Sequence, residues 1–428
     1  MSLMKNQGCF FHQGSGAEQE LQGLTANQCF LLGYLSNERQ LYQQLNIENG
    51  DQQALLNAAV SHWGREANRH LFGDYLLIWL TDEQLMVTSS ARASFTLFYT
   101  RDKDQLALAT DLKLLTEMVQ AGLNQSYLLQ LLALGQLAAK DTSFEQISRL
   151  QAGETLIWQL EKEIALTHES RLSDTEQLEL VQLFALPPGE ALAPRTVDDV
   201  NETGLFNQLP SLAYRLGEPV VDAALAHFDS LVHASSSDTL VLDISWLNAR
   251  NTVAEQANNK IWCKSILKRP LLAQRKVLQQ CQQQLASAFK AAQDEHSEFL
   301  TFSQWLDLHY VIPAWCQLLQ RICRLHGKTL INPYMQPGHL MPVVKQAVKP
   351  SSAYFSLQQI SLANVYDAMQ RLFYTGEAGT RELFDLNPMD TAGLLRKTER
   401  RRVEQLAVLV LTLDYLVRFE PGGVAGKG

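Results

Sequence analysis

Residues 71–117 carry the pattern that most constrains what this chain can fold into. Short apolar runs, rich in aromatic and β-branched side chains, alternate there with polar turns, and the runs are Leu71–Leu80, Leu85–Thr88, Phe95–Thr100 and Leu106–Thr110. Runs of this length between polar turns are typical of antiparallel strands. The segment 111–117 that follows favours a helix. The stretch therefore predicts an antiparallel meander closed by a helix.

The chain on either side of this stretch mixes short strands and helices. Asp51 is a candidate N-cap of one helix, because its carboxylate can accept the free N–H groups of a first helical turn. We expect strands at 9–12 and 28–35, helices at 39–45, after Asp51 and at 125–139, and a hairpin of 153–158 with 164–167. These elements place residues 1–185 in one α+β domain.

The pattern changes after residue 185. Proline and glycine break regular structure in the segment 186–208, which we predict to be a linker. From 209 to 428 apolar residues recur at helical spacing, which predicts a mainly α-helical second domain with one clear strand at 239–244. With 428 residues and a hydrophobic content of 46%, the chain can bury two cores.

Composition argues against several functional classes. The chain has no apolar run long enough for a membrane span, and its first residues lack the apolar core of a secretion signal. A net charge of −9 disfavours nucleic acid as a partner. The six cysteines show neither paired spacing nor histidines at metal-ligand spacing, so we expect a reduced, cytoplasmic protein without a metal site.

Three motifs carry a resemblance to a known family. Gly73–Leu80 is similar to a Gly-x-Phe-Ala-Phe-x-x-Trp-Asp strand, Thr96–Tyr99 to a Pro-Leu-Tyr-Tyr strand, and Leu108–Lys113 to a Phe-Ala-Ser-Glu-x-Lys strand-to-helix turn. In this order they resemble the glutaminase domain of the glutamine-hydrolysing, B-type asparagine synthetases. The resemblance implies a β-sandwich with helices, of the N-terminal-nucleophile type, followed by a synthetase-derived domain.

The resemblance implies that the nucleophile for glutamine hydrolysis is missing. In the family an N-terminal Cys attacks the amide, and its free amine acts as the base. Here Ser2 follows Met1, and Lys5 follows Met4 if the chain starts there. The nearest cysteine, Cys9, lies inside a predicted strand. We therefore expect no catalytic residue for this reaction.

The residues that hold glutamine are also replaced. The family's Asn-Gly-Glu corresponds to Leu32, Gly33 and Tyr34, so only the glycine is kept. Asp51 matches a glutamine-site aspartate, although capping a helix explains it more simply. These four positions form a degenerate glutamine site.

The second half resembles the synthetase part of the family in a reduced form. Its turn after residue 216 is similar to the Asp-Glu-Pro-x-x-Asp turn, which makes Glu218 and Asp222 candidates for a vestigial cleft, together with Asp243 and Lys345. The family's two phosphate loops are missing, because no Ser-Gly-Gly-x-Asp-Ser occurs and the strand at 239–244 continues into bulky residues.

Three hypotheses follow. The first is a degenerate asparagine synthetase homologue that needs no cofactor and binds or regulates a protein partner, such as a full-length homologue. The second is an ATP- and Mg²⁺-dependent amide ligase, like the β-lactam synthetases and lasso-peptide cyclases that resemble this family. The third is a protein that binds a peptide or small ligand near Glu218 and Asp222. The sequence leaves the oligomeric state open.

Overall fold

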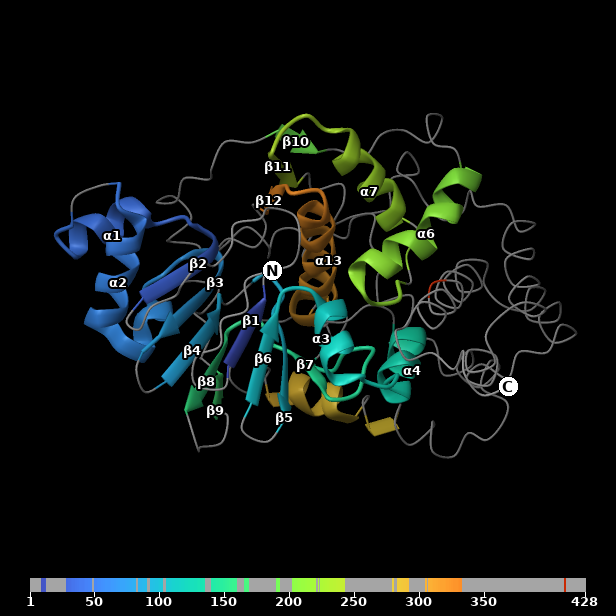
Figure 1. The fold of residues 1–428 in the computed structure, drawn as a ribbon, viewed down its shortest axis with the longest axis horizontal. Coiled ribbons are helices and arrows are strands. Elements are labelled where there is room, and N and C mark those ends of the chain that lie inside the picture. The colour runs from blue at the N-terminus through green and yellow to red at the C-terminus, as the bar shows by residue number, and fades with distance from the viewer. Residues whose placement is uncertain are drawn as a thin grey trace, which may run out of the picture.

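The protein is described from a computed structural model, which shows two facing sheets, a third small sheet and surrounding helices (Figure 1). Placement is described for residues 9–12, 28–47, 50–81, 84–90, 93–102, 105–134, 140–159, 165–168, 190–192, 202–220, 222, 224–242, 279–280, 283–291, 305, 307–332 and 412.

Two sheets make up the first half. The five-stranded sheet is antiparallel in the order β2-β3-β4-β8-β9, with β2 (Gln28–Leu35), β3 (Gly73–Leu80), β4 (Gln84–Ser89), β8 (Glu154–Gln159) and β9 (Ala165–His168). The four-stranded sheet has the order β1-β6-β5-β7, with β1 (Cys9–His12), β6 (Gln105–Ala109), β5 (Phe98–Asp102) and β7 (Ile147–Arg149). Strand β1 runs parallel to β6, whereas β5 is antiparallel to both its neighbours.

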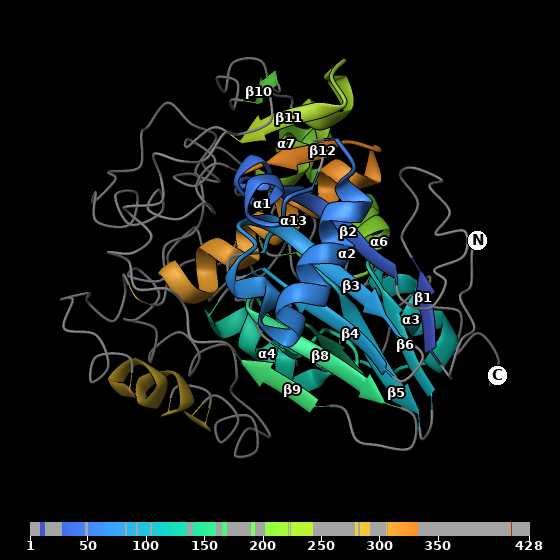
Figure 2. The ribbon, with the colours of Figure 1, turned by 90° about the vertical axis from the view of Figure 1, so that its left-hand side faces the viewer.

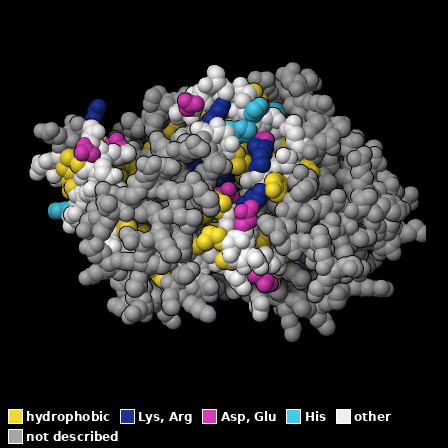
Figure 3. Space-filling model, viewed as in Figure 1, with side chains coloured by type: hydrophobic (Ala, Val, Ile, Leu, Met, Phe, Trp, Pro, Cys, Tyr) yellow, Lys and Arg dark blue, Asp and Glu magenta, His cyan; other side chains and the backbone are white. Residues whose placement is uncertain are grey.

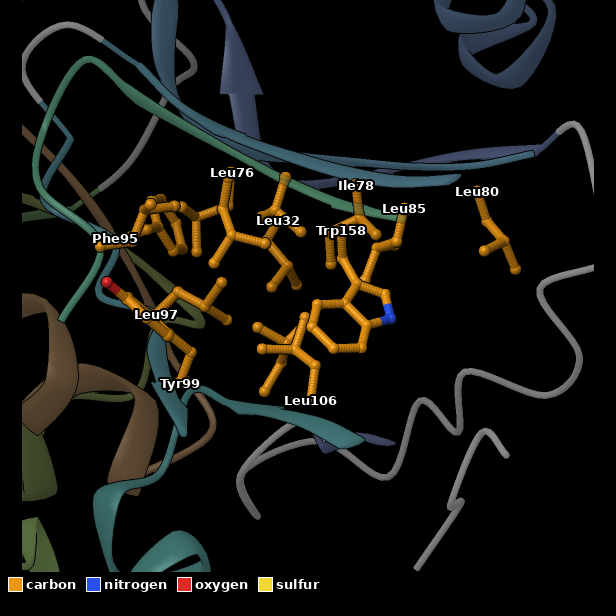
Figure 4. Close-up of a cluster of buried hydrophobic side chains, with 14 residues drawn as sticks. Leu32, Leu76, Ile78, Leu80, Leu85, Phe95, Leu97, Tyr99, Leu106 and Trp158 are labelled. Atoms are coloured by element: carbon orange, nitrogen blue, oxygen red, sulfur yellow. The ribbon is translucent and has the colours of Figure 1, made fainter. Parts of the chain in front are cut away.

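The main core lies between these two sheets. Leu76 and Ile78 of β3 point into it from one sheet, and Leu97, Tyr99 and Leu106 enter it from the other side (Figure 4). Alternate residues of β3 face the opposite way and are buried under helices. Because both faces of this strand are covered, its sequence is apolar from Tyr75 to Leu80 instead of alternating with polar residues.

Helices cover the outer face of each sheet, so the first half has four layers (Figure 1). On the five-stranded side lie α1 (Glu38–Gln44), α2 (Gln52–Trp63) and the 3₁₀ helix η1 (Gly64–Arg69). On the four-stranded side lie α3 (Leu112–Val119) and α4 (Gln125–Leu134). The α+β assignment of the first half, its strands and its hairpin are confirmed. Residues 135–139 of the expected helix lie outside the described residues.

The predicted meander is wrong in one respect. Strands β3 and β4 pair in one sheet and β5 and β6 in the other, so the chain changes sheets between Ser89 and Phe98. Strand length and turn spacing identify hairpins but do not show which hairpins share a sheet. Residues 93–97 of the crossing segment are buried, which is why the Phe95–Leu97 part looks like a strand in the sequence.

The second half contains a small sheet beside its helices, and the strand expected at 239–244 is present as Thr239–Leu242. A third sheet has three parallel strands in the order β10-β11-β12, formed by β10 (Glu190–Leu192), β11 (Thr239–Leu242) and β12 (Thr329–Ile331) (Figure 2). Strand β10 falls in the segment expected to be a linker. Strands of three residues show no periodicity, so the sequence pattern missed β10 and β12.

Three long helices accompany this sheet. They are α6 (Glu202–Leu216), α7 (Ala224–Ala234) and α13 (Ile312–Leu325), which a π-helical turn, η4 (Asp307–Val311), precedes. Helix α13 contacts α6, α7 and β12 and is buried along most of its length. No helix among the described residues is long and apolar enough to cross a membrane.

Candidate functional site

Of the positions that resemble the family's glutamine motif, Leu32 and Tyr34 are closed by packing, whereas Gly33 is exposed. Leu32 on β2 is only 6% exposed and belongs to the core between the sheets (Figure 4). Tyr34 is 8% exposed. Gly33 between them has a φ of +112°, and a Cβ there would lie 2.1 Å from the carbonyl oxygen of Asp74 and 2.8 Å from Cε2 of Phe95. A side chain at Gly33 is therefore excluded by both backbone conformation and contact.

Asp51 is an N-cap, as the sequence indicates. Its carboxylate accepts a hydrogen bond from the backbone N–H of Ala54 at 2.9 Å, in the first turn of α2. Asp51 itself is exposed and lies at the start of a helix on the outer layer. The helix cap explains an aspartate at this position without any role in binding a substrate.

Asp74 is a buried acid that sequence reasoning missed. It is paired with Tyr34 across β2 and β3 and is fully buried. Its carboxylate accepts hydrogen bonds from the backbone N–H of Ser94, at 2.8 Å, and from the Ser94 hydroxyl. Burial raises the pKa of Asp74 to about 6, although the bonds from Ser94 and Phe95 oppose this. An acidic residue within an otherwise apolar strand is the signal that could have found it.

The backbone of Ser90 forms hydrogen bonds with three neighbouring backbone segments. Its N–H donates to the carbonyl of Tyr75 at 3.0 Å, and its own carbonyl accepts from the backbone N–H groups of Ala93 at 3.1 Å and Gly153 at 2.9 Å. Ser90 and its neighbour Ser89 are both buried. This end of the sandwich is thus held by internal hydrogen bonds.

Glu218 does not lie in an open cleft. It is 1% exposed, and its carboxylate accepts from Nη2 of Arg149 at 3.0 Å and from Nη1 of Arg321. Arg321 also donates to the carbonyl of Leu216. Arg149 ends β7 in the first half and Arg321 is on α13 in the second, so one carboxylate joins the two halves of the chain.

The charge of Glu218 stabilises the charged form of the buried Arg149. Burial alone would lower the pKa of the Arg149 guanidinium, but the nearby charge of Glu218 raises it above its usual value. The ring of Phe98 lies 5.5 Å from the Arg149 guanidinium and 5.0 Å from that of Arg321. Neither arginine was singled out from the sequence, because an isolated Arg in a strand or helix gives no pattern.

Of the other cleft candidates, the structure describes Asp222. Asp222 is 5% exposed, and its carboxylate accepts from the backbone N–H of Ala224 at 2.9 Å, which caps α7. Asp243 and Lys345 lie outside the described residues. Cys9 is the first residue of β1. In the part of the chain that is described, no three His, Cys, Asp or Glu side chains gather as metal ligands would.

A hollow opens beside this cluster. Its empty volume is about 370 Å³, including the part open to solvent. Residues of α13 and α6 and the turn before α3 line it, namely Thr110, Asp111, Arg215, Leu216, Arg321, Arg324 and Leu325. Phe95 connects it to the closed site, since its ring packs at Gly33 and also lies 5.8 Å from the guanidinium of Arg324.

A family model described as a glutamine amidotransferase domain matches residues 27–169. This range is a third of the chain and runs from β2 to the end of β9. The segment is glutamine amidotransferase-like. The amidotransferase-like segment thus includes both facing sheets except β1.

Two solved structures are similar to this chain over part of its length. One is a glutamine phosphoribosylpyrophosphate amidotransferase from B. subtilis complexed with ADP and GMP, at 16% identity and a TM-score of 0.26, over 43% of this chain and 37% of that one. The other is described as the allosteric regulatory enzyme of purine biosynthesis, at 14% identity and a TM-score of 0.26, over 43% and 36%. The chain thus spans less than two fifths of either structure. No curated protein matches the chain.

Proposed function

We propose that this protein is an amidotransferase-like, asparagine synthetase-related protein that does not hydrolyse glutamine and acts as a binding or regulatory subunit. The observation that carries the proposal is the burial of Leu32 and Tyr34, at positions that resemble the family's glutamine motif. Leu32 is buried in the core, and the ring of Phe95 lies beside Gly33. A polar amide substrate placed there would lose its water without gaining hydrogen-bond partners.

The remaining polar groups of this region support the same proposal. The carboxylate of Asp51 caps α2, and that of Asp74 accepts hydrogen bonds from Ser94. Glu218, the family's synthetase-side acid by resemblance, is neutralised by two arginines. Acids held this way already have hydrogen-bond or ion-pair partners within the protein, which supports a retained scaffold over a retained reaction. We propose a full-length homologue or another cytoplasmic protein as the partner.

Glutamine hydrolysis is the direct test. The full chain is incubated with glutamine, and released glutamate is measured beside an active amidotransferase and beside the variant Cys9→Ser. We expect no glutamate above the buffer level from either form, and no change in melting temperature with glutamine. Glutamate release that Cys9→Ser abolishes would contradict the proposal, because it would show that Cys9 acts as a nucleophile.

The second candidate is an ATP-dependent amide ligase. The parallel sheet of β10, β11 and β12 favours it, because sheets of this kind often carry nucleotide sites at their carboxyl ends. Titration with ATP and Mg²⁺, followed by calorimetry, separates the two. A saturable heat of binding would favour the ligase, and we expect none.

A further inference from the structure

The hollow beside Glu218 has an unusual charge balance. Four guanidinium groups lie in or next to it, on Arg149, Arg215, Arg321 and Arg324. Three carboxylates face them, on Asp111, Glu218 and Asp229. Glu218 is shared by two arginines. The cluster therefore holds more cationic than anionic side chains.

Each of the first three arginines is accounted for. Arg149 and Arg321 bind Glu218, and Arg215 pairs with Asp229 at 2.5 Å. The second oxygen of Asp229 lies 2.8 Å from Nε2 of His326, so that carboxylate has no oxygen to spare. The Asp111 carboxylate, which also lines the hollow, accepts from the backbone N–H of Lys113 at 3.0 Å.

Arg324 is different. Among the described residues no carboxylate forms an ion pair with it, and its printed neighbour is the ring of Phe95. Arg324 is half-buried, and burial lowers the pKa of its guanidinium to about 10. It lies three residues after Arg321 on α13, so the two side chains share one face of the helix and both line the hollow.

We propose that this hollow binds a small oxyanion, a phosphate or carboxylate group, through Arg324 with Arg321 and Arg215. A guanidinium presents two parallel N–H donors that match the paired oxygens of either group. An anion between these helices would balance the excess of positive charge. The carbonyl groups in the last turn of α13 favour a nearby cation. They carry only a partial negative charge, so they do not balance a guanidinium fully.

A ligand bound in the hollow would contact both halves of the chain. It lies between the turn before α3 in the first half and α6 and α13 in the second. Figure 3 shows acidic and basic side chains gathered in a band on this side of the molecule, over the region of α13 and α3. Anion binding here is independent of glutamine hydrolysis, because none of the residues that line the hollow is among the four positions compared with the family's glutamine site.

Isothermal titration of the full chain tests this site. Sodium phosphate and sodium succinate are titrated separately, with sodium chloride of the same ionic strength as the reference. We expect saturable binding of phosphate, succinate or both, and the arm that binds identifies the group. Arg324→Gln should weaken it on the order of tenfold, because a charge-assisted, two-pronged contact is lost. The matched control is Arg101→Gln, whose guanidinium also lies over a ring, that of Trp158 at 5.5 Å, but outside the hollow.

A measurement on the unaltered protein covers the case in which Arg324→Gln does not fold. Phenylglyoxal modifies guanidinium groups, and the modified positions are read by mass spectrometry. Saturating ligand should slow modification of Arg324 severalfold and leave Arg101 unchanged. The proposal is overturned if neither anion binds the unaltered chain saturably. It is equally overturned if Arg324 is modified at the same rate with and without ligand, or if folded Arg324→Gln binds as tightly as the unaltered protein.

Discussion

The closed position at Leu32 and Tyr34 and the charged junction at Glu218 are buried in opposite ways. At the first, the packing is apolar, and Leu32 is part of the core between the sheets. At the second, an acid is buried, and arginines from both halves surround it. Filling a pocket with apolar groups needs no partner, whereas a buried carboxylate needs compensating charge.

This difference shows where the molecule is tolerant and where it is not. The closed position depends on packing, which accepts apolar groups of similar volume. The junction depends on three specific side chains drawn from β7, the turn after α6, and α13. A change at the junction should therefore have the larger effect.

Glu218→Ala should give the largest effect. It leaves Arg149 and Arg321 buried without a counter-charge, and breaking a buried pair in this way costs about 3–5 kcal/mol. The free energy of unfolding in urea measures the loss. The control is Glu66→Ala, which removes an ion pair whose side chains are more than half exposed and should cost less than about 1 kcal/mol. Equal losses in the two variants would mean that Glu218 is not buried in solution.

Asp74→Asn tests the closed position through pH. Burial raises the pKa of Asp74 from 3.8 to about 6, so between these values the folded protein keeps a proton that the unfolded chain releases. The stability this contributes is present below the lower value and lost as pH rises through the upper one. An asparagine cannot ionise and can keep both bonds to Ser94. Removing the buried charge should therefore raise the free energy of unfolding near pH 8 by up to roughly 3 kcal/mol.

The check is the pH dependence of that gain. Urea unfolding at about pH 8 and about pH 4 should show a larger stabilisation by Asp74→Asn at the higher pH. Asp141→Asn, at an exposed position, serves as the control and should change little at either pH. A gain that is the same at both pH values would show that Asp74 stays ionised in the fold.

Asp51→Ala should give the smallest effect. Loss of the cap on α2 costs about 1 kcal/mol, and Asp51→Ser should recover most of it because a hydroxyl also accepts from the first turn. Thermal unfolding measures both. If Asp51 instead served a glutamine site, its replacement would change the response to glutamine, and no such change is expected.

The sequence predicted the first half better than the second. Runs such as Gly73–Leu80 are long enough to identify strands, and Asp51 before a helix is a local signal that needs no tertiary information. The change of sheet after Ser89 was missed, because both sheets are covered on both faces and their strands look alike. Strands β10 and β12 were missed because three residues carry no periodicity.

In the site, too, local sequence features could be predicted, whereas contacts between residues distant in the sequence could not. The loss of polar residues at Leu32 and Tyr34 could be read from the aligned motif. The ion pairs of Glu218 could not be predicted from the sequence, because its partners lie 69 and 103 positions away. The residues around Arg149 and Arg321 give no sign that either pairs with a carboxylate. Asparagine synthetase ancestry stays a prediction for the whole chain.

The wide sequence separation at the junction also bears on how the chain folds during synthesis. Arg321 is made 103 residues after Glu218, and Thr412, whose hydroxyl donates to the carbonyl of Val220 at 3.3 Å, follows 192 residues after Val220. Among the described residues that precede α13, Arg149 is the one that pairs with this acid. Contacts so distant along the chain form slowly. The junction is therefore completed late, and a nascent chain stalled before residue 321 would expose it to proteases and chaperones.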